Sequence, residues 1–518
     1  MQEMNNKILT FLILFLSVLF VIVFFLWQGN VGFSLWDEGY LWYGAQRVLL
    51  GEVPLLDFKA YDPGRYYWAA AFMHLFGDNG IMSLRASVAI FQAIGLFVGL
   101  FLICSSAKQQ NIFYILLSAI ILMLWMYPRH KLFDISLSLL LMGVMTFLIQ
   151  NPTARRYFIA GLIVGLAAVF GKNHGLYGII GSLATMLWLS IKPNPSHTLG
   201  SVRGFFLWSA GVIAGFMPVI IMALVIPGFA EAFFQDIYFR YERNFSTLPM
   251  PVPWPWLADF LPGAYAEGIR QVLIGLLFVA TVAFGVLFII WVFYQKMRGK
   301  QTSPVVVAAA FLMLPYAHHA YSSSDVSHLA QGIFPLLIGF LALFYSLPSK
   351  IKWPLSLTLC LASLLIMLPQ HPGWQCRGSS RCVNVEISQD NLKVRQETAR
   401  DIELLRHLAR QYASQGETFI AVPVWPGAYA LLERKSPIWE IFPLLPQSKA
   451  FEETEIERIK QARPAFAVII DFPLRGRDEL RYKNTHPLTN KFIQDNFERL
   501  PYPPRPEYQI YKAKWISG

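Results

Sequence analysis

Two adjacent carboxylates follow the first long apolar run of the chain. Asp37 and Glu38 stand in the sequence Trp36-Asp37-Glu38-Gly39-Tyr40, where aromatic residues frame them. Ionisable groups beside a membrane segment are expensive to desolvate, so they are functional candidates by default. A carboxylate in this position can take a proton from a hydroxyl group and act as a general base.

A structural alternative applies to the same pair. Residues 38–50 place apolar side chains along one helical face, the pattern of a helix that lies in the membrane interface. Asp37 is then expected at the N-cap, and Glu38 would favour the positive end of the helix dipole. Capping alone needs only one of the two residues, so we expect chemistry from the pair as well.

Other ionisable residues recur at the ends of apolar runs. A second stretch, Tyr61-Asp62-Pro63-Gly64-Arg65-Tyr66-Tyr67-Trp68, lies in the same predicted loop. Residues of the same kind follow at Arg129-His130-Lys131, Asp134, Lys172-Asn173-His174, His318-His319, Ser322-Ser323-Ser324-Asp325 and His328. Cations in such clusters can stabilise negative charge that develops on a phosphate group.

The elements that carry these residues are predicted to be membrane helices. The chain has 518 residues, of which 55% are hydrophobic and only 14% are charged, a composition outside the range of soluble proteins. The apolar runs are long enough to approach or cross a hydrocarbon core of roughly 30 Å. We count eleven, at roughly 8–27, 81–104, 111–127, 133–150, 157–171, 175–191, 204–226, 269–294, 304–320, 328–347 and 353–369. The first is interpreted as a retained anchor.

Basic residues predict the orientation of these helices. With a cytoplasmic N-terminus, the inward segments contain Lys7, Lys108, Arg155, Arg156, Lys192, Arg203, Lys296, Arg298, Lys300, Lys350 and Lys352. The short outward turns contain fewer, namely Arg129, Lys131 and Lys172. This bias agrees with the positive-inside rule, and eleven spans place the C-terminus outside. The net charge of +11 is therefore mainly a topological signal, and no basic tract indicates nucleic acid.

All the mixed-charge clusters fall on the outward side of this predicted topology. A transporter would need polar groups near the bilayer midplane that are reachable from both sides. Here the polar groups lie at the ends of the predicted helices. This arrangement indicates an active site at one membrane interface.

The chain changes character after about residue 371, where polar residues become frequent. We predict a separate α/β domain with a helix near 390–413 and buried strands at 418–422 and 466–470. It contains no phosphate loop or nucleophile motif, which favours acceptor binding or support. The loop 227–268 carries a proline- and tryptophan-rich run, typical of either a lid for acceptor recognition or an interfacial linker.

Two of the four cysteines lie just beyond the last predicted helix. Cys376 and Cys382 occur in Cys-Arg-Gly-Ser-Ser-Arg-Cys, where an oxidising compartment would let them form a disulfide. A zinc site is the alternative, but no further ligands lie nearby in the sequence. Cys104 and Cys360 fall within predicted helices.

These motifs together resemble the GT-C glycosyltransferases, which include protein O-mannosyltransferases, the lipid A aminoarabinose transferase and lipopolysaccharide-core glycosyltransferases. An acidic pair after the first membrane helix marks this family. The resemblance extends to 61–68, to Asp134, to Gly171-Lys172-Asn173-His174-Gly175 and to Ser324-Asp325-Val326-Ser327-His328 before Pro335. In one departure, Pro63 stands where many relatives have lysine, so the phosphate contact would move to Arg65.

The resemblance implies both a fold and an activity. The fold is a polytopic all-α membrane protein of about eleven helices, at 1–370 with the outer loop 28–80, followed by a periplasmic α/β domain at 371–518. The activity is transfer of a sugar from a polyprenyl-phosphate donor to a periplasmic acceptor, which is a glycolipid, a polysaccharide or a protein. The expected course is a single displacement with inversion, since no separate nucleophile stands out. The retained anchor, the outer domain and the predicted disulfide favour the inner membrane of a Gram-negative bacterium.

The resemblance also assigns roles to residues. Asp37 and Glu38 are the catalytic candidates, with Asp37 preferred as the base. The residues expected to bind substrate are Asp62, Arg65, Arg129, Lys131, Asp134, Lys172, His174, His319, Asp325 and His328. A divalent metal stays an open alternative because some branches of the family need one, and His318, His319, Asp325 and His328 are the candidate ligands. The competing interpretation is that Ser322–Ser324 cap a helix and that Asp325 favours the positive end of its dipole.

Two other functions are compatible with these patterns. A polysaccharide ligase that uses a pyrophosphate-linked donor is the nearer rival, although it would favour a large basic outer loop. A non-catalytic transporter or assembly protein is the other, although we find neither inverted repeats nor charges in the middle of a helix. The sequence identifies neither the sugar, nor the acceptor, nor the oligomeric state.

Overall fold

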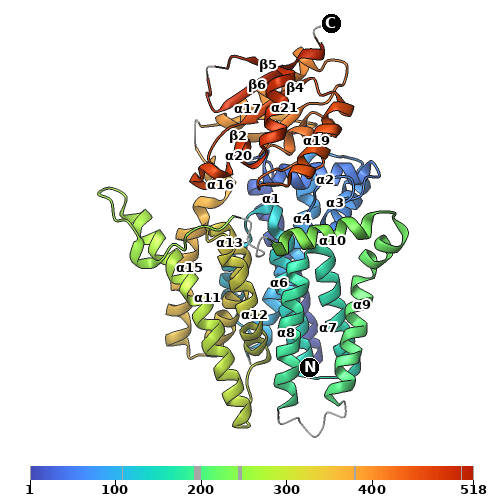
Figure 1. Ribbon diagram of the computed structural model, residues 1–518. Coiled ribbons are helices and arrows are strands. Elements are labelled where there is room, and N and C mark those ends of the chain that lie inside the picture. Colours follow the sequence, from blue (N-terminus) through green and yellow to red (C-terminus); the bar gives the residue numbers. More distant parts are fainter. Residues whose placement is uncertain are drawn as a thin grey trace. The chain divides into compact units, whose positions relative to one another are not determined.

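The computed structural model describes residues 2–107, 109–191, 200–242, 248–378, 381–502 and 504–516. Lys108, Lys192 and residues 243–247 of the predicted 227–268 loop lie outside the described residues. The chain forms two compact units (Figure 1). We call residues 1–29, 88–230 and 237–375 the helical unit, and residues 30–87, 231–236 and 376–518 the α/β unit.

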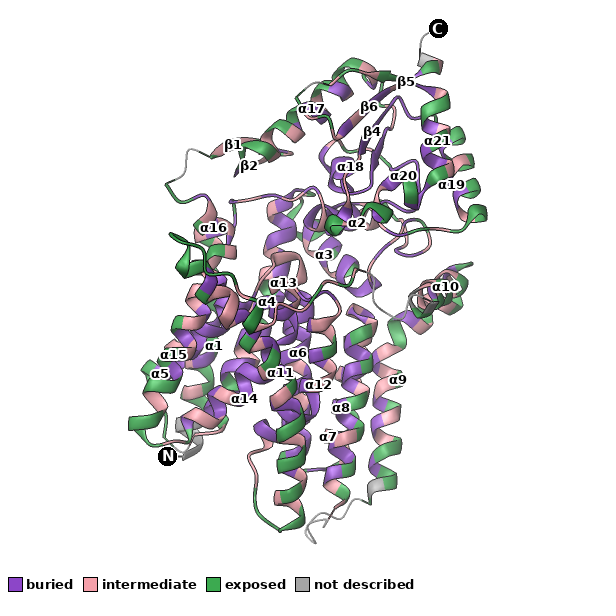
Figure 2. Ribbon diagram, turned by 60° about the vertical axis from the view of Figure 1, so that its left-hand side comes forward, coloured by how far each residue is buried: buried purple, intermediate pink, exposed green. Residues whose placement is uncertain are grey.

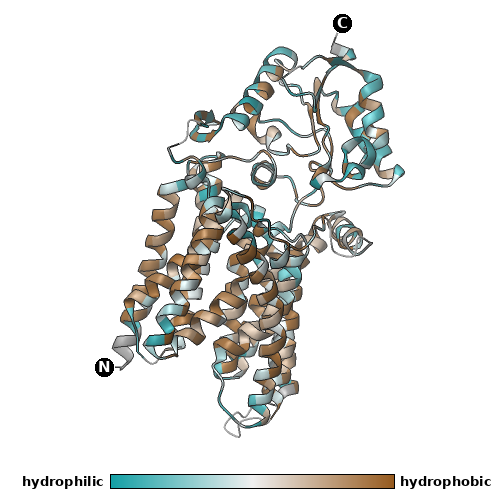
Figure 3. Ribbon diagram, turned by 90° about the vertical axis from the view of Figure 1, so that its left-hand side faces the viewer, coloured by the Kyte–Doolittle hydropathy of each residue, from teal (hydrophilic) through white to brown (hydrophobic). Residues whose placement is uncertain are grey.

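The helical unit is built from long helices that lie side by side (Figure 1). They are α1 (Gln2–Gln28), α4 (Ile81–Ser105), α5 (Ile112–Trp125), α6 (Leu132–Gln150), α7 (Ala154–Phe170), α8 (Lys172–Ser190), α9 (Ser201–Val225), α11 (Tyr265–Met297), α12 (Pro304–Tyr321), α14 (Phe334–Tyr345) and α15 (Ser349–Met367). Shorter elements are η1 (Arg129–Lys131), η2 (Pro255–Leu257), α13 (Val326–Gly332), η3 (Leu368–Gln370) and α16 (Pro372–Gln375). The helix α10 (Phe229–Glu242) and the start of α4 cross the boundary, because residues 231–236 and 81–87 belong to the α/β unit. Figure 3 shows that the long helices are hydrophobic along most of their length.

The number of membrane spans is smaller than the sequence predicts. Seven helices among the described residues are long and apolar enough to cross a membrane, or eight if the bent pair α13–α14 counts as one span. All eleven predicted runs are helical, but α5 and α7 have only 14 and 17 residues. α8 begins with three polar residues, Lys172, Asn173 and His174, which lower its hydropathy. The predicted class, a multi-pass helical membrane protein, is confirmed; the count of eleven is not.

Small residues fix the contact between α7 and α9. A Cβ on Gly161 or Gly165 would lie 2.0–2.2 Å from backbone carbonyl oxygens of α9, and a Cβ on Gly211 or Gly215 would lie equally close to carbonyls of α7. Only glycine permits this approach, which is typical of the small-xxx-small pattern in membrane helices. This close contact fixes the position of α7 beside α9. α7 ends just before Gly171, where the chain turns into α8.

The α/β unit combines the first loop with the C-terminal chain. The loop contributes α2 (Asp37–Leu49) and α3 (Pro63–Phe76). The sequence-based division placed this loop with the membrane domain, whereas its contacts group it with residues 376–518. The remaining helical elements are α17 (Gln396–Tyr412), α18 (Gly427–Leu431), α19 (Lys449–Ala462), η4 (Leu474–Gly476), η5 (Asp478–Leu480), α20 (Tyr482–Thr485), α21 (Pro487–Asn496) and η6 (Lys514–Ile516).

A four-stranded sheet of order β3-β4-β6-β5 forms the core of this unit. β3 (Ile420–Val422) runs parallel to β4 (Phe466–Ile470), and β6 (Tyr508–Ala513) is antiparallel to both β4 and β5 (Phe497–Leu500). β3 is buried along its whole length, and so is β4 (Figure 2), as continuous apolar runs predict. Both predicted strands are therefore confirmed.

A separate hairpin corrects the predicted helix near 390–413. β1 (Cys382–Ile387) pairs with β2 (Asp390–Arg395), so the helix α17 begins only at Gln396. Leu392 suits a strand as well as a helix, because it and Val394 are buried while Lys393 between them is not. The predicted disulfide between Cys376 and Cys382 is present at the start of this hairpin.

Candidate active site

The acidic pair opens the helix α2. Trp36 is the N-cap residue and makes no side-chain capping bond, so Asp37 is the first helical residue and Glu38 is the second. The prediction that Asp37 caps the helix is therefore wrong. Both carboxylates still lie in the first turn, where the partial positive charge of the helix end stabilises negative charge.

Glu38 is fully engaged by a residue that the sequence analysis did not consider. Nε and Nη2 of Arg85, near the start of α4, donate to the two carboxylate oxygens of Glu38 at 2.8 Å each. Arg85 also donates to the carbonyl of Gly32 at 2.7 Å. Glu38 is 5% exposed and Arg85 is 4% exposed, so this is a buried bidentate ion pair. Its geometry fixes α2 against the chain that precedes it and against residues 81–87, the part of α4 that belongs to the same unit.

Asp37 has a different environment from its neighbour. It is half-buried, and in the described part of the chain its carboxylate takes part in no hydrogen bond or ion pair. The adjacent Trp36 ring lies 5.6 Å from that of Phe472, which holds the chain just before the helix. Of the two catalytic candidates, Asp37 is thus the one whose oxygens are available to a substrate.

Asp62 and Arg65 lie at the start of α3. Asp62 is its N-cap residue, in extended conformation but without a side-chain capping bond, and Pro63 occupies the first helical position. Both Asp62 and Arg65 are buried, at 8% and 3% exposure. The Arg65 guanidinium lies 5.1 Å from the ring centre of Tyr61. So little exposed surface makes Arg65 a weaker candidate for binding phosphate than the sequence suggests.

Three of the helices in the helical unit meet at a buried polar chain. His174 Nε2 lies 2.8 Å from Asp134 Oδ1, and His174 Nδ1 lies 2.8 Å from the Tyr316 hydroxyl. Asp134 is in the first turn of α6, His174 is near the start of α8, and Tyr316 is in α12. His174 is 1% exposed and Asp134 is 5% exposed. The two predicted residues therefore contact each other, and Tyr316 is an addition.

The basic turn before α6 holds the end of α1. Arg129 Nη1 donates to the carbonyl of Gln28 at 2.8 Å. The Gln28 side chain lies 3.2 Å from His371 Nδ1, whose Nε2 lies 3.0 Å from the carbonyl of Leu124. Burial lowers the pKa of His371 to about 4, so the ring is neutral at pH 7. Sequence reasoning missed His371, although it directly follows the last apolar helix.

These contacts gather at one end of the helical unit. They join the ends of α1 and α5 to the turn before α6, and the starts of α6 and α8 to the last turns of α12. Lys131 and Lys172 lie in the same turns, each half-buried. Within this unit, the predicted gathering of polar residues at one end is confirmed.

The late polar cluster divides into separate contacts. Asp325 is the N-cap of α13 and accepts hydrogen bonds from the backbone N–H of His328 at 2.9 Å and from its ring at 3.0 Å. His319 Nε2 instead lies 3.2 Å from Gln331 Oε1, and His318 Nδ1 lies 3.2 Å from the Tyr177 hydroxyl. A helix cap is therefore present, but Asp325 itself is the cap residue, not Ser322–Ser324 as predicted. Among the described residues, no group of three or more His, Cys, Asp or Glu is arranged to hold a metal ion, so the predicted ligand set does not fit one.

Comparison with known proteins addresses the fold. No protein-family model and no curated protein sequence matches the chain. Among solved structures, it is similar to ArnT from Cupriavidus metallidurans bound to undecaprenyl phosphate, with a TM-score of 0.54 and 12% identity over 99% of each chain. The apo state of the same ArnT aligns with a TM-score of 0.47 and 12% identity over 100% of each chain. An Archaeoglobus fulgidus oligosaccharyltransferase tethered to an acceptor peptide aligns with a TM-score of 0.47 and 12% identity, over 98% of this chain and 74% of that one.

This chain has the GT-C fold. The similarity to the first ArnT structure covers both the helical unit and the α/β unit, so the fold expected from the motifs is confirmed for the whole chain. At 12% identity the similarity assigns no role to any residue. Roles within the GT-C fold must be argued from the contacts described above.

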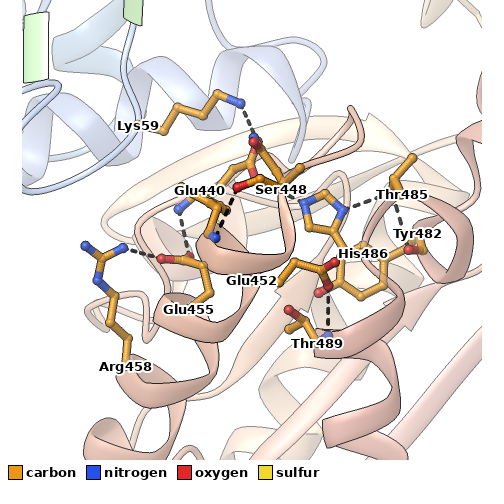
Figure 4. A network of polar contacts seen from close by, with 12 residues as sticks. Lys59, Glu440, Ser448, Glu452, Glu455, Arg458, Tyr482, Thr485, His486 and Thr489 are labelled. Carbon is orange, nitrogen blue, oxygen red and sulfur yellow. Dashed lines mark hydrogen bonds and ion pairs between the residues drawn. The ribbon is translucent and has the colours of Figure 1, made fainter. Parts of the chain in front are cut away.

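A second buried network in the α/β unit escaped the sequence analysis (Figure 4). Lys59, from the loop between α2 and α3, forms an ion pair with Glu440, which also accepts a hydrogen bond from Gln447 at 2.8 Å and lies 3.1 Å from His486 Nε2. Lysine and glutamate are common in this part of the chain, so no sequence signal distinguishes these two. Only the fold brings them together.

Proposed function

We propose that this chain is an integral membrane glycosyltransferase that moves a sugar from a polyprenyl-phosphate carrier to an acceptor hydroxyl on the non-cytoplasmic side. The observation that supports this proposal best is the unequal environment of the acidic pair in a GT-C fold. Glu38 gives both oxygens to Arg85, whereas the half-buried Asp37 keeps its carboxylate available within the described structure. ArnT, which shares this fold, was crystallised with undecaprenyl phosphate.

In this mechanism Asp37 takes the proton of the acceptor hydroxyl. The acceptor oxygen then forms a bond to the anomeric carbon of the sugar while the bond from that carbon to the phosphate oxygen breaks. The electron pair of the broken bond stays on the departing polyprenyl phosphate, whose negative charge increases. A single displacement of this kind inverts the anomeric configuration and needs a base and cations but no protein nucleophile.

The cations assigned to the departing phosphate come from the predicted set in the helical unit. Lys131 and Arg129 are half-buried, so part of each side chain is accessible to a ligand. The Nζ atom of Lys172 is itself buried, so its assignment rests on its place in the motif. Arg65, at 3% exposure, is assigned to holding the first loop. Asp134 and His174 contact each other and are assigned to orienting the starts of α6 and α8, which carry the cationic turns.

The test compares the wild-type protein with Asp37→Asn, which keeps the side-chain shape but removes the base. Purified protein in lipid nanodiscs is incubated with polyprenyl-phosphate sugars, pyrophosphate-linked sugars and an acceptor extract of the cell envelope, and the released carrier lipid is measured by mass spectrometry. A lost general base lowers kcat about 10²–10⁴-fold. Asp495→Asn is the matched control, because Asp495 is exposed and its carboxylate pairs with Lys491 along α21.

The outcomes separate the candidate functions. Release of polyprenyl phosphate by the wild type, lost in Asp37→Asn and kept in Asp495→Asn, supports the proposal. Turnover confined to pyrophosphate-linked donors would make the chain a ligase. Turnover that survives in Asp37→Asn would reject Asp37 as the base, and an inactive wild type that binds none of the donors would reject the glycosyltransferase.

A further inference from the structure

Two glycines place the first turn of α2 directly against the C-terminal chain. Gly39 follows Asp37 by two positions, and Gly427 is the first residue of α18. A Cβ on Gly39 would lie 2.5 Å from the Cα of Gly427, and a Cβ on Gly427 would lie 2.8 Å from the Cα of Gly39. Both distances are shorter than real Cβ atoms permit, so any side chain here would push α2 away.

Backbone hydrogen bonds lock the same contact. The N–H of Gly427 donates to the carbonyl of Leu35 at 2.9 Å, and the N–H of Gly39 donates to the carbonyl of Ser34 at 2.9 Å. The turn that presents Asp37 is therefore held from both sides by main-chain atoms. Main-chain contacts have no rotamers to change, so they fix a position more tightly than side chains do.

The chain that follows Gly427 continues along the first loop. The N–H of Ser436 donates to the Tyr43 hydroxyl at 2.9 Å, on the far part of α2. Trp439 contacts the loop after α2 in two ways: its Nε1 donates to the carbonyl of Leu56 at 3.1 Å, and its carbonyl accepts from the N–H of Lys59 at 2.8 Å. We call residues 427–440 the clamp segment.

A buried ion pair ends the clamp segment (Figure 4). Glu440 is 1% exposed and pairs with Lys59, while its own N–H donates to Glu455 Oε2 at 3.2 Å. Burial alone would raise the pKa of Glu440, but the Lys59 charge and the contacts with His486 outweigh burial and hold this pKa below its ordinary value. Buried pairs of this kind add little net stability but specify one arrangement of the groups around them.

We propose that the clamp segment positions Asp37 for catalysis, with Gly427 and Glu440 as its two positioning residues. This inference rests on the proposed function. It assigns the C-terminal chain to the catalytic machinery, where the sequence analysis favoured acceptor binding or support. Neither residue touches substrate, because the Gly427 backbone packs on Gly39 and the Glu440 carboxylate is buried; both act through α2 and the loop behind it.

The test introduces Gly427→Ala, whose methyl group must displace the first turn of α2. A shift of about 1 Å at a reacting group lowers turnover by about 10²-fold. We expect kcat to fall by at least about 10-fold with the KM for the lipid donor unchanged, because the donor contacts are not altered. Gly200→Ala is the matched control, since a Cβ at Gly200 meets nothing within 4 Å.

A second readout does not depend on turnover. Hydrogen exchange of peptides that cover residues 30–61 is compared between wild type, Gly427→Ala and Trp439→Phe. The second variant removes the hydrogen bond to Leu56 and leaves a smaller ring beside Phe451. The melting temperature of each variant is measured beside it. Faster exchange confined to these peptides, with melting close to wild type, shows that the clamp segment holds the loop. Trp439→Phe replaces Gly427→Ala in the kinetic test if the alanine variant does not fold.

Each result decides the inference. A lower kcat with an unchanged donor KM and faster exchange in 30–61 supports it. An unchanged kcat, or a raised KM with unchanged kcat, overturns it. An active wild type with an unaffected Gly427→Ala rejects the clamp and keeps the proposed function. An inactive wild type rejects that function and with it the catalytic role of the clamp, while exchange still reports whether the segment holds α2.

Discussion

The two units place ionisable groups in opposite ways. In the helical unit His174 lies within hydrogen-bond distance of both Asp134 and Tyr316. These residues lie among apolar helices, where few other polar groups are available as partners. In the α/β unit Glu440 is surrounded by Lys59, His486 and further polar groups (Figure 4). An isolated polar contact in an apolar bundle stands out already in the sequence, whereas the members of a network in a mixed domain do not.

The largest effect is expected from the buried ion pair of the α/β unit. Arg85→Met leaves the Glu38 carboxylate buried at 5% exposure without its bidentate partner. Loss of one partner of a buried pair costs about 3–5 kcal/mol, measured as the free energy of unfolding in detergent. The double variant Glu38→Gln, Arg85→Met should recover part of this loss, and a single variant that loses under about 1 kcal/mol would contradict the prediction.

An intermediate effect is expected in the helical unit. His174→Phe keeps a ring at the site but removes both hydrogen bonds, to Asp134 and to Tyr316. Leaving a buried acceptor unsatisfied costs about 1–3 kcal/mol. Thermal unfolding should show this loss in full, and Tyr316→Phe, which removes only one of the two bonds, should lose less. Equal losses of stability in His174→Phe and Tyr316→Phe would contradict this prediction, because the bond to Asp134 would then add nothing to the bond to Tyr316.

The difference between the units also explains what the sequence predicts. Asp134 and His174 are recognisable because ionisable residues are rare within apolar runs, but their direct contact joins α6 to α8 and depends on helix packing. Arg85 sits inside a predicted apolar run, where nothing indicates a partner at Glu38. Glu440 and Lys59 lie in charged surroundings and are separated by most of the chain, so their pairing follows only from the fold.

The same limit applies to the secondary structure. β3 and β4 are continuous apolar runs and were predicted, since a fully buried strand has a distinct composition. The hairpin of β1 and β2 mixes polar and apolar residues, so the sequence gives no prediction for β1 and predicts β2 as the start of a helix. Tertiary pairing decides such short strands more than their own sequence does.

The smallest effect is expected from a titration within the α/β unit. Burial raises the pKa of Asp401 to about 6, from an ordinary value of 3.8. Because the folded state binds this proton more tightly than the unfolded chain, stability is present at low pH and is lost as the pH rises from about 4 to about 6. Asp401 is partly accessible to water, so we expect a loss of about 1 kcal/mol.

Asp401→Asn should abolish this pH dependence and raise the melting temperature at pH 7 but not at pH 3. His174→Phe, in the helical unit, should leave the dependence between pH 4 and pH 6 in place. Melting curves of both variants across this range test the assignment. An unchanged pH profile in Asp401→Asn would place the titrating group elsewhere.

The contact between Gly39 and Gly427 has a consequence for biosynthesis. The chain is made at about 5–20 residues per second, so α2 emerges on the order of 20–80 s before Gly427 does. During that interval the backbone of α2 at Gly39 cannot pack against Gly427. The aromatic side chains of α2 are then exposed unless another group packs on them. The first loop thus depends on a segment that is translated after all the helices of the helical unit. A polypeptide truncated before Gly427 would therefore contain every helix of the membrane bundle and still lack a completed Asp37 site.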